Sequence, residues 1–168
     1  KKCFRIQGDS LWKGKTLYQL YKEAYTPWVW QPKLKRIAKK LGLIWFSSPF
    51  DPTAVEFLEE LGCPAYKVAS FEITDIPLIK YICTKGKPVI ISTGVAELAD
   101  IKAAVGACRR SGNSKLALLK CASSYPAAPE ESNLVTIPDM ARRFRTIVWI
   151  SDHSRGIAVP IAAVAMGA

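Results

Sequence analysis

Hydroxyl side chains follow a series of apolar runs along this 168-residue sequence, and the last of them stands beside a carboxylate and the only imidazole. Hydroxyls can hydrogen-bond a ligand or cap the following helix, and one hydroxyl can do both. A carboxylate can transfer protons, and an imidazole can also bind a metal ion. These groups are Ser47-Ser48, Ser70, Ser92-Thr93, Ser123-Ser124 and Ser151-Asp152-His153. They become one polar site if the fold brings the ends of the runs together.

The apolar runs alternate with amphipathic stretches that begin and end as helices do. The stretch 51–62 is typical, with Asp51 as N-cap, Pro52 in the first turn and Gly62 past the end. Near-continuous apolar runs indicate strands that are covered on both faces, as in parallel sheets. The five runs are Leu43–Phe46, Ala65–Ala69, Pro88–Ile91, Lys115–Leu119 and Ile147–Ile150.

Two parallel architectures fit this repetition, a doubly wound sheet and a (β/α)8 barrel. In an open sheet only the strand ends beside the switch point face a ligand, whereas all strand ends ring one mouth of a barrel. Polar residues after every run therefore favour the barrel. A complete barrel needs roughly 200 to 250 residues, so the sequence predicts an α/β fold that is a partial TIM (β/α)8 barrel.

The first 42 residues form a separate basic and aromatic segment. Residues 1–45 hold eleven Lys or Arg against two Asp or Glu, which is almost all of the net charge of +10. Thr16 is placed to cap a helix that Thr26-Pro27 would end, and the lysines of 33–40 interleave with apolar residues as on a solvated helix face. We expect the aromatic residues to pack in a core or to support a loop beside a pocket. Base stacking and a nucleic-acid patch are the alternative, and we expect no nucleic-acid partner.

The cysteines and the hydropathy exclude several classes of protein. Five scattered cysteines without a CxxC pair predict reduced thiols, neither a disulfide framework nor a zinc site. No apolar run reaches the roughly 18 to 20 residues of a membrane-spanning helix. The chain opens on Lys1-Lys2-Cys3-Phe4-Arg5 without the apolar stretch of a signal peptide. We therefore expect a cytoplasmic protein with no membrane partner.

Five blocks of the sequence stand out in chain order: Phe46–Asp51, Ala65–Glu72, Ile90–Gly94, Lys120–Pro126 and Ser151–His153. In this order they resemble the sialic acid synthase family, which condenses phosphoenolpyruvate with an amino-sugar aldehyde. The resemblance extends over practically all of the chain. The stretches 11–28 and 71–77 are similar to the pseudaminic acid synthase branch of the family.

The resemblance implies roles for individual residues. The positions that match phosphoenolpyruvate-binding groups are Ser48, Lys67, Ser70, Ser92 and Ser151. One ammonium group and several hydroxyls suit a phosphate dianion. Glu72 matches the acidic residue beside the reacting carbons, where a carboxylate could transfer a proton or stabilise positive charge. Its other possible role is as a negative charge near a helix that begins around residue 74.

The resemblance also implies a sugar pocket and a divalent metal, Mn²⁺ or Mg²⁺. Ser123, Tyr125 and Asp152 match positions of the sugar site, and His153 matches the first metal ligand, which makes it a catalytic residue as well. The metal would polarise the sugar aldehyde as a Lewis acid. In the family the second ligand lies about twenty residues later, so it is expected after residue 168.

The resemblance makes this chain an internal piece of a synthase about twice its length. Residues 1–42 lead into the barrel, and residues 43–168 form its central part, about strands 3 to 7. The first two strands, the last strand and a C-terminal antifreeze-like domain are not included. That domain reaches into the partner subunit's site in the family, so we expect the intact protein to be a homodimer. Other hypotheses are an N-acetylneuraminate or legionaminate synthase, and a catalytically inactive barrel fragment.

Overall fold

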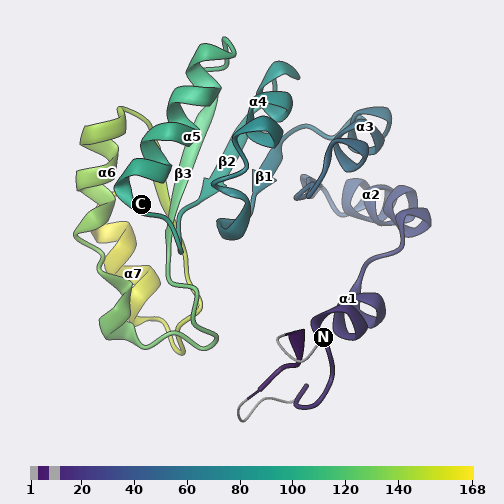
Figure 1. Ribbon diagram of the computed structural model, residues 1–168. Coiled ribbons are helices and arrows are strands. Elements are labelled where there is room, and N and C mark those ends of the chain that lie inside the picture. Colours follow the sequence, from purple (N-terminus) through teal and green to yellow (C-terminus); the bar gives the residue numbers. More distant parts are fainter. Residues whose placement is uncertain (1–3, 8–11) are drawn as a thin grey trace. The chain divides into compact units, whose positions relative to one another are not determined.

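The computed structural model describes residues 4–7 and 12–168, which divide into two compact units. Unit 1 comprises residues 1–43 and unit 2 comprises residues 44–168 (Figure 1). The predicted thiol Cys3 lies outside the described residues. None of the described helices is long and apolar enough to cross a membrane.

The described residues of unit 1 form two α-helices, and their ends follow from local sequence. α1 spans Leu17–Ala24, and Thr16 caps it as predicted: its hydroxyl accepts from the Gln19 backbone N–H at 3.2 Å. The Gln19 side chain accepts from the Thr16 backbone N–H at 2.9 Å, which completes a capping box. A single 3-10 turn, η2 (Trp28–Trp30), leads into α2 (Gln31–Lys40).

The aromatic residues of unit 1 do not pack in a core, which is one of the two roles expected for them. The six of them from position 12 to position 30 are each at least 46% exposed, and neither α1 nor α2 has a buried residue. The physical reason is that the described part of unit 1 offers two short helices and no sheet against which they could bury an apolar face. The six residues are Trp12, Tyr18, Tyr21, Tyr25, Trp28 and Trp30.

Unit 2 is built around a parallel sheet whose order decides between the two predicted architectures. Its strands β1 (Tyr66–Val68), β2 (Val89–Ser92), β3 (Leu116–Cys121) and β4 (Ile147–Ser151) pair in the order β1-β2-β3-β4. Every neighbouring pair is parallel (Figure 1). A doubly wound sheet reverses its strand order at a switch point, whereas strands follow one another in a barrel. The α/β partial-barrel prediction is therefore confirmed.

The first predicted strand, 43–46, does not form. Only a single bridge joins Ser47 to Tyr66, through the Lys67 backbone N–H and the Ser47 carbonyl oxygen at 3.1 Å. A strand needs consecutive hydrogen-bonded pairs with a neighbouring strand. The neighbour available to residues 43–46 is β1, which is only three residues long. Leu43 and Ile44 are consequently 61% and 80% exposed.

Five α-helices of unit 2 connect and flank the strands. The Asp51 carboxylate caps α3 by accepting from the Ala54 backbone N–H at 2.9 Å, and Gly62 follows the helix with φ +64°, both as predicted. The Asp75 carboxylate caps α4 in the same way, through the Leu78 N–H at 3.0 Å. The helices are α3 (Pro52–Glu60), α4 (Ile76–Thr84), α5 (Leu98–Arg110), α6 (Thr136–Phe144) and α7 (Ala158–Ala165). Short 3-10 turns are η3 (Ser70–Glu72) and η4 (Pro129–Ser132).

Alternate strand residues face the helices and form the core. Val68, Ile91, Leu118 and Val148 stand side by side in the register, and each is at most 3% exposed. They pack with apolar residues of α4, α5 and α6 in one cluster. Because side chains alternate between the faces of a strand, the residues between them lie on the opposite face of the sheet.

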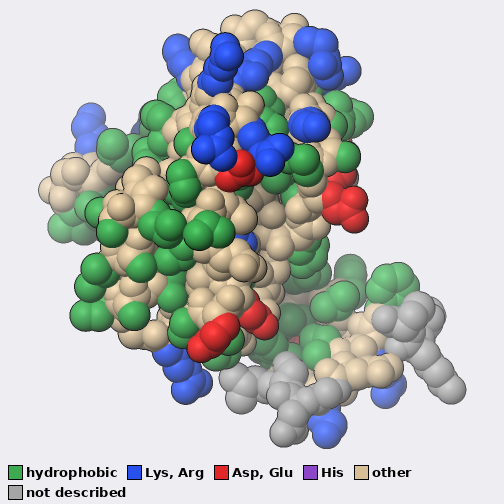
Figure 2. Space-filling view, turned by 90° about the vertical axis from the view of Figure 1, so that its left-hand side faces the viewer, with side chains coloured by type: hydrophobic (Ala, Val, Ile, Leu, Met, Phe, Trp, Pro, Cys, Tyr) green, Lys and Arg blue, Asp and Glu red, His purple; other side chains and the backbone are tan. Residues whose placement is uncertain are grey.

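The opposite face of the sheet is incompletely covered. A hollow of about 440 Å³ is lined by Ile90, Ala117, Ile147 and Trp149, together with residues at the amino ends of β2 to β4. On the helix side of the sheet, the surface that carries α6 and α7 exposes hydrophobic side chains beside a group of Lys and Arg (Figure 2). Apolar surface of this extent is typical of a barrel layer that other strands and helices would cover.

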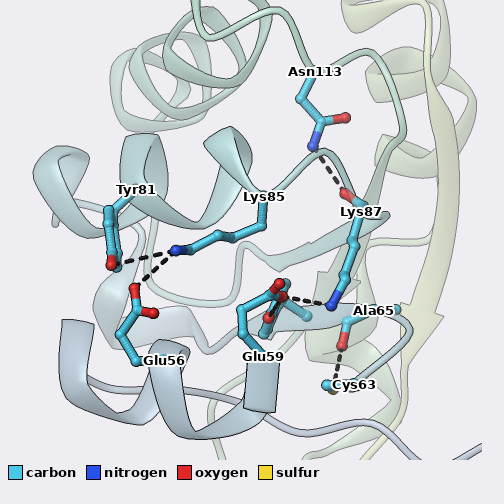
Figure 3. Close-up of polar contacts among 9 residues, drawn as sticks. Glu56, Glu59, Cys63, Ala65, Tyr81, Lys85, Lys87 and Asn113 are labelled. Carbon is cyan, nitrogen blue, oxygen red and sulfur yellow. Dashed lines mark hydrogen bonds and ion pairs between the residues drawn. The ribbon is translucent and has the colours of Figure 1, made fainter. Parts of the chain in front are cut away.

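A polar network ties α3 and α4 to the amino ends of the strands (Figure 3). Glu59 on α3 accepts from the hydroxyl of Tyr66, which is fully buried, and from Lys87 Nζ at 2.5 Å. Lys85, just after α4, donates to Glu56 at 2.8 Å and lies over the Tyr81 ring at 4.3 Å. Burial opposes the charge of Glu59, but the hydrogen bonds from Lys87 and Tyr66 outweigh it and lower its pKa.

We predict that Glu59→Gln destabilises unit 2 by about 1 to 3 kcal/mol at pH 7, because Tyr66 and Lys87 lose a charged acceptor. The lowered pKa of Glu59 means that its stabilisation is present above its unfolded value of 4.5 and is lost as the pH falls through the folded value. Urea unfolding at pH 7 and pH 3 measures this difference. Glu60→Gln, at the exposed neighbouring position, is the control. Equal effects of the two variants at pH 7 would contradict the network.

Candidate active site

Three predicted site residues lie on the sheet face opposite the helices. Lys67, Ser92 and Ser151 each alternate with a core residue of their strand, so their side chains share the other face. Ser92 and Ser151 are the last residues of β2 and β4, and Lys67 is the middle residue of β1. The parallel register therefore brings these residues to one face near the carboxyl ends of the strands.

The chain segments after β1 and β2 and the end of β3 meet at Gly94. The Gly94 backbone N–H donates to Ser70 Oγ at 3.2 Å, and Ser70 Oγ lies 3.4 Å from Cys121 Sγ. A Cβ on Gly94 would lie 2.5 Å from Ser123 Oγ and 3.0 Å from Cys121 Sγ. Two predicted residues, Ser70 and Ser123, are thus brought together by a backbone position that has no room for a side chain.

The sequence prediction missed Gly94 and Cys121 as members of this cluster. A glycine directly after a strand was the available signal, because glycine marks places where another part of the chain approaches closely. Cys121 was interpreted only as a core thiol, and it is 5% exposed. Its sulfur also fills space between the strand ends.

Lys67 supplies positive charge at the site. Its side chain is half-buried, and it forms no ion pair with any residue in the described part of the chain. In the register Lys67 pairs with Ile90 on β2, and Ile90 pairs with Ala117 on β3. An ammonium group without a carboxylate partner beside several hydroxyls can bind an anion such as a phosphate.

Glu72 carries a partly buried carboxylate close to Ser70 in the sequence. It ends η3, two residues after Ser70. Its Oε2 atom is buried and has no hydrogen-bond partner among the described residues. Burial raises the pKa of Glu72, and the nearby Asp75 carboxylate raises it further. A raised pKa favours a carboxyl group that can exchange a proton near neutral pH.

His153 is held in one orientation by its backbone and ring contacts. Its Nδ1 lies 3.0 Å from the Ala122 carbonyl oxygen, which can only accept, so Nδ1 carries the proton. The imidazole ring also lies 4.2 Å from the Tyr125 ring, centroid to centroid. In a neutral imidazole with this tautomer the lone pair is on Nε2, which is the arrangement found in metal-binding histidines.

The described residues do not complete a metal site around His153. They contain no group of three or more His, Cys, Asp or Glu side chains placed to hold a metal ion. The neighbouring Asp152 uses Oδ1 to accept from the Ser154 backbone N–H at 2.8 Å. The donor set in this chain is therefore one oriented imidazole, which by itself does not bind a divalent cation firmly.

The structure does not bring all of the predicted residues together. Ser48 is half-buried and makes no hydrogen bond to another predicted site residue within the described chain. Tyr125 is 75% exposed. Ser151, Asp152 and His153 line a cavity of only about 10 Å³, which has the size of a water site and not of a sugar site.

Comparisons with known proteins point to one family. The NeuB family model matches residues 1–168. The chain is 44% identical to pseudaminic acid synthase of Helicobacter pylori over 165 residues, 98% of this chain and 48% of that protein. It is 40% identical to N,N'-diacetyllegionaminic acid synthase of Campylobacter jejuni over 133 residues, 78% of this chain and 40% of that protein.

A solved structure supports the same relationship. The N-acetylneuraminic acid synthetase of Leptospira borgpetersenii, crystallised with citrate, superposes with a TM-score of 0.85 at 33% identity, over 89% of this chain and 52% of that one. The chain belongs to the NeuB family. It spans about half the length of the curated relatives that it matches.

We predict that Gly94→Ala destabilises unit 2 by about 1 to 3 kcal/mol, because the added methyl group overlaps Ser123 Oγ and displaces the strand ends. Gly106→Ala on α5 is the matched control. There the new Cβ meets the flexible Arg110 side chain at 2.9 Å, and alanine favours the helix. Urea unfolding compares the two variants. A neutral Gly94→Ala would show that the strand ends are not packed closely around this backbone.

Proposed function

We propose that the full-length protein condenses phosphoenolpyruvate with an amino-sugar aldehyde and is a pseudaminic acid synthase. The observation that carries this proposal is the shared sheet face of Lys67, Ser92 and Ser151, with Ser70 hydrogen-bonded beside it. An unpaired ammonium group and several hydroxyls at strand ends suit the phosphate of an enol phosphate. Membership of the NeuB family adds the reaction class.

In the proposed reaction a carbon–carbon bond forms and a carbon–oxygen bond breaks. C3 of phosphoenolpyruvate attacks the aldehyde carbon of the sugar, and the aldehyde oxygen takes up a proton. Water adds to the resulting cation at C2. The tetrahedral intermediate then expels inorganic phosphate by cleavage of its C–O bond, which leaves the keto group of the nine-carbon acid pseudaminate.

The residues of this chain take separate roles in the proposed reaction. Lys67 and the serine hydroxyls hold the phosphate and fix the enol over the aldehyde. Glu72 exchanges a proton with the sugar oxygen or the attacking water, because burial raises its pKa. Its ionised form stabilises the positive charge at C2. Ser123, Tyr125 and Asp152 line the sugar side of the site.

We also propose that the full-length protein holds Mn²⁺ or Mg²⁺, with His153 as one ligand. The second ligand is expected after residue 168, since the relatives are about twice as long as this chain. When bound, the ion supplies Lewis-acid chemistry at the aldehyde. The contact of Nδ1 with the Ala122 carbonyl oxygen would orient the His153 ring so that Nε2 could bind the ion.

The proposed sugar is 2,4-diacetamido-2,4,6-trideoxy-altropyranose. The support is the higher identity to a pseudaminic acid synthase, 44% over 98% of this chain, than to a legionaminic acid synthase, 40% over 78%. The Leptospira neighbour keeps N-acetylneuraminate formation as a second candidate. A homodimer and a cytoplasmic location stay predictions for the intact protein.

Phosphate release with each sugar tests the substrate. With manganese and phosphoenolpyruvate, the full-length protein is expected to turn over the altropyranose at least about 10-fold faster than N-acetylmannosamine or the legionaminate precursor. Equal turnover of N-acetylmannosamine would contradict the pseudaminate assignment.

The 168-residue chain in the same assay is expected to be inactive, because its metal donor set is incomplete. Clear turnover by that chain would refute the inactive-fragment hypothesis.

We predict that Lys67→Ala in the full-length protein lowers kcat/KM about 10- to 100-fold, because a charge-assisted bond to phosphate is worth about 1.5 to 3 kcal/mol. Glu72→Gln is expected to lower kcat about 100-fold or more with KM for phosphoenolpyruvate little changed. Lys80→Ala, at an exposed position of α4, is the control. The residue roles would be wrong if Lys67→Ala and Lys80→Ala gave the same kcat/KM.

A further inference from the structure

Two buried thiols meet at the end of the helix layer away from the site. Cys83 lies in the last turn of α4 and Cys108 near the end of α5, and each is 1% exposed. Their sulfur atoms are 2.6 Å apart. A disulfide bond is about 2.05 Å long, so the two sulfurs need only a small further approach to become bonded. The other described cysteines of the core, Cys63 and Cys121, have no sulfur neighbour within hydrogen-bonding distance in the described chain.

Asn113 holds the two cysteine backbones in place. Its backbone N–H donates to the Cys108 carbonyl oxygen at 3.1 Å, and its side-chain Nδ2 donates to the Cys83 carbonyl oxygen at 3.3 Å. The same Nδ2 donates to the Lys87 carbonyl oxygen at 2.8 Å (Figure 3). Asn113 is 5% exposed. One buried amide thus fixes the ends of both helices. The two thiols are therefore held side by side before they react, which lowers the entropy cost of bond formation.

We propose that Cys83 and Cys108 form a reversible disulfide when the protein meets a mild oxidant such as hydrogen peroxide. In the structure all four described cysteines are free. The pair differs from the other thiols in having a partner at bonding range. Its chemistry belongs to the class of cytosolic redox-sensitive cysteines.

The oxidation proceeds in two balanced steps. The Cys108 thiolate attacks one oxygen of hydrogen peroxide, the O–O bond breaks, and water leaves once the second oxygen has taken up a proton. The Cys83 sulfur then attacks the sulfenic sulfur of Cys108, the S–O bond breaks, and a second water leaves. Two thiols are oxidised to one disulfide, and one peroxide is reduced to two waters. The hydrogen bond from Cys83 lowers the pKa of Cys108, which makes Cys108 the attacking thiol.

The disulfide is expected to stabilise the protein without changing the site. α4 and α5 end just before the amino ends of β2 and β3, whereas the predicted site residues lie at the carboxyl ends. The bond closes a loop of 25 residues, and such loops raise unfolding temperatures by about 5 to 10 °C. Turnover by the full-length protein should therefore be unchanged.

Peptide mapping of the full-length protein tests the proposal. After peroxide treatment and alkylation in denaturant, trypsin is expected to release peptide 81–85 joined to peptide 103–109, lighter by two hydrogens than their sum. Because both thiols are buried, a second arm refolds the reduced protein in a glutathione redox buffer, which gives both sulfurs access to oxidant. Cys63→Ala should retain the joined peptide, and Cys83→Ala should lose it.

Thermal unfolding gives an independent readout. Oxidised wild-type protein should unfold about 5 to 10 °C above the reduced protein, and Cys83→Ala should show no such difference. Recovery of peptides 81–85 and 103–109 as separate, alkylated thiols after peroxide treatment would overturn the proposal, and joined peptides from the refolding arm alone would not support it. Separate peptides that carry sulfinic or sulfonic acids would overturn it as well.

Discussion

The parallel pairing of β1 to β4, in one unbroken register, is the constraint on which the rest of unit 2 depends. It places Val68, Ile91, Leu118 and Val148 in one row against the helices. Since side chains alternate along a strand, the same register places the intervening residues on the other face. The core and the candidate site are therefore two consequences of a single pattern of backbone hydrogen bonds. A shift of one residue in any strand would exchange them.

The register also brings the candidate site residues to one end of the sheet. All four strands run the same way, so their carboxyl ends and the segments after them converge, and Gly94 lets Ser70, Cys121 and Ser123 approach a shared backbone. The opposite end carries structural pairs instead, among them Glu59 with Lys87. This separation allows the amino end to be stabilised, or cross-linked, with little consequence for the site.

Local features were predictable from the sequence, and features that need distant partners were not. The caps formed by Thr16 and Asp51 involve residues three positions apart, and both are present. The strand expected at 43–46 is absent because pairing requires a neighbour that sequence pattern alone does not supply. The roles of Gly94 and of the Cys83 and Cys108 pair depend on contacts across the fold, which composition and periodicity do not reveal.

The proposed phosphate site at the carboxyl ends of the sheet can be observed in a crystal structure of the full-length protein with phosphoenolpyruvate and manganese. We expect phosphate oxygens about 2.7 to 3.2 Å from Lys67 Nζ and from the hydroxyls of Ser70, Ser92 and Ser151. Phosphoenolpyruvate bound elsewhere, with Lys67 facing no anion, would show that these strand ends are not the phosphate site.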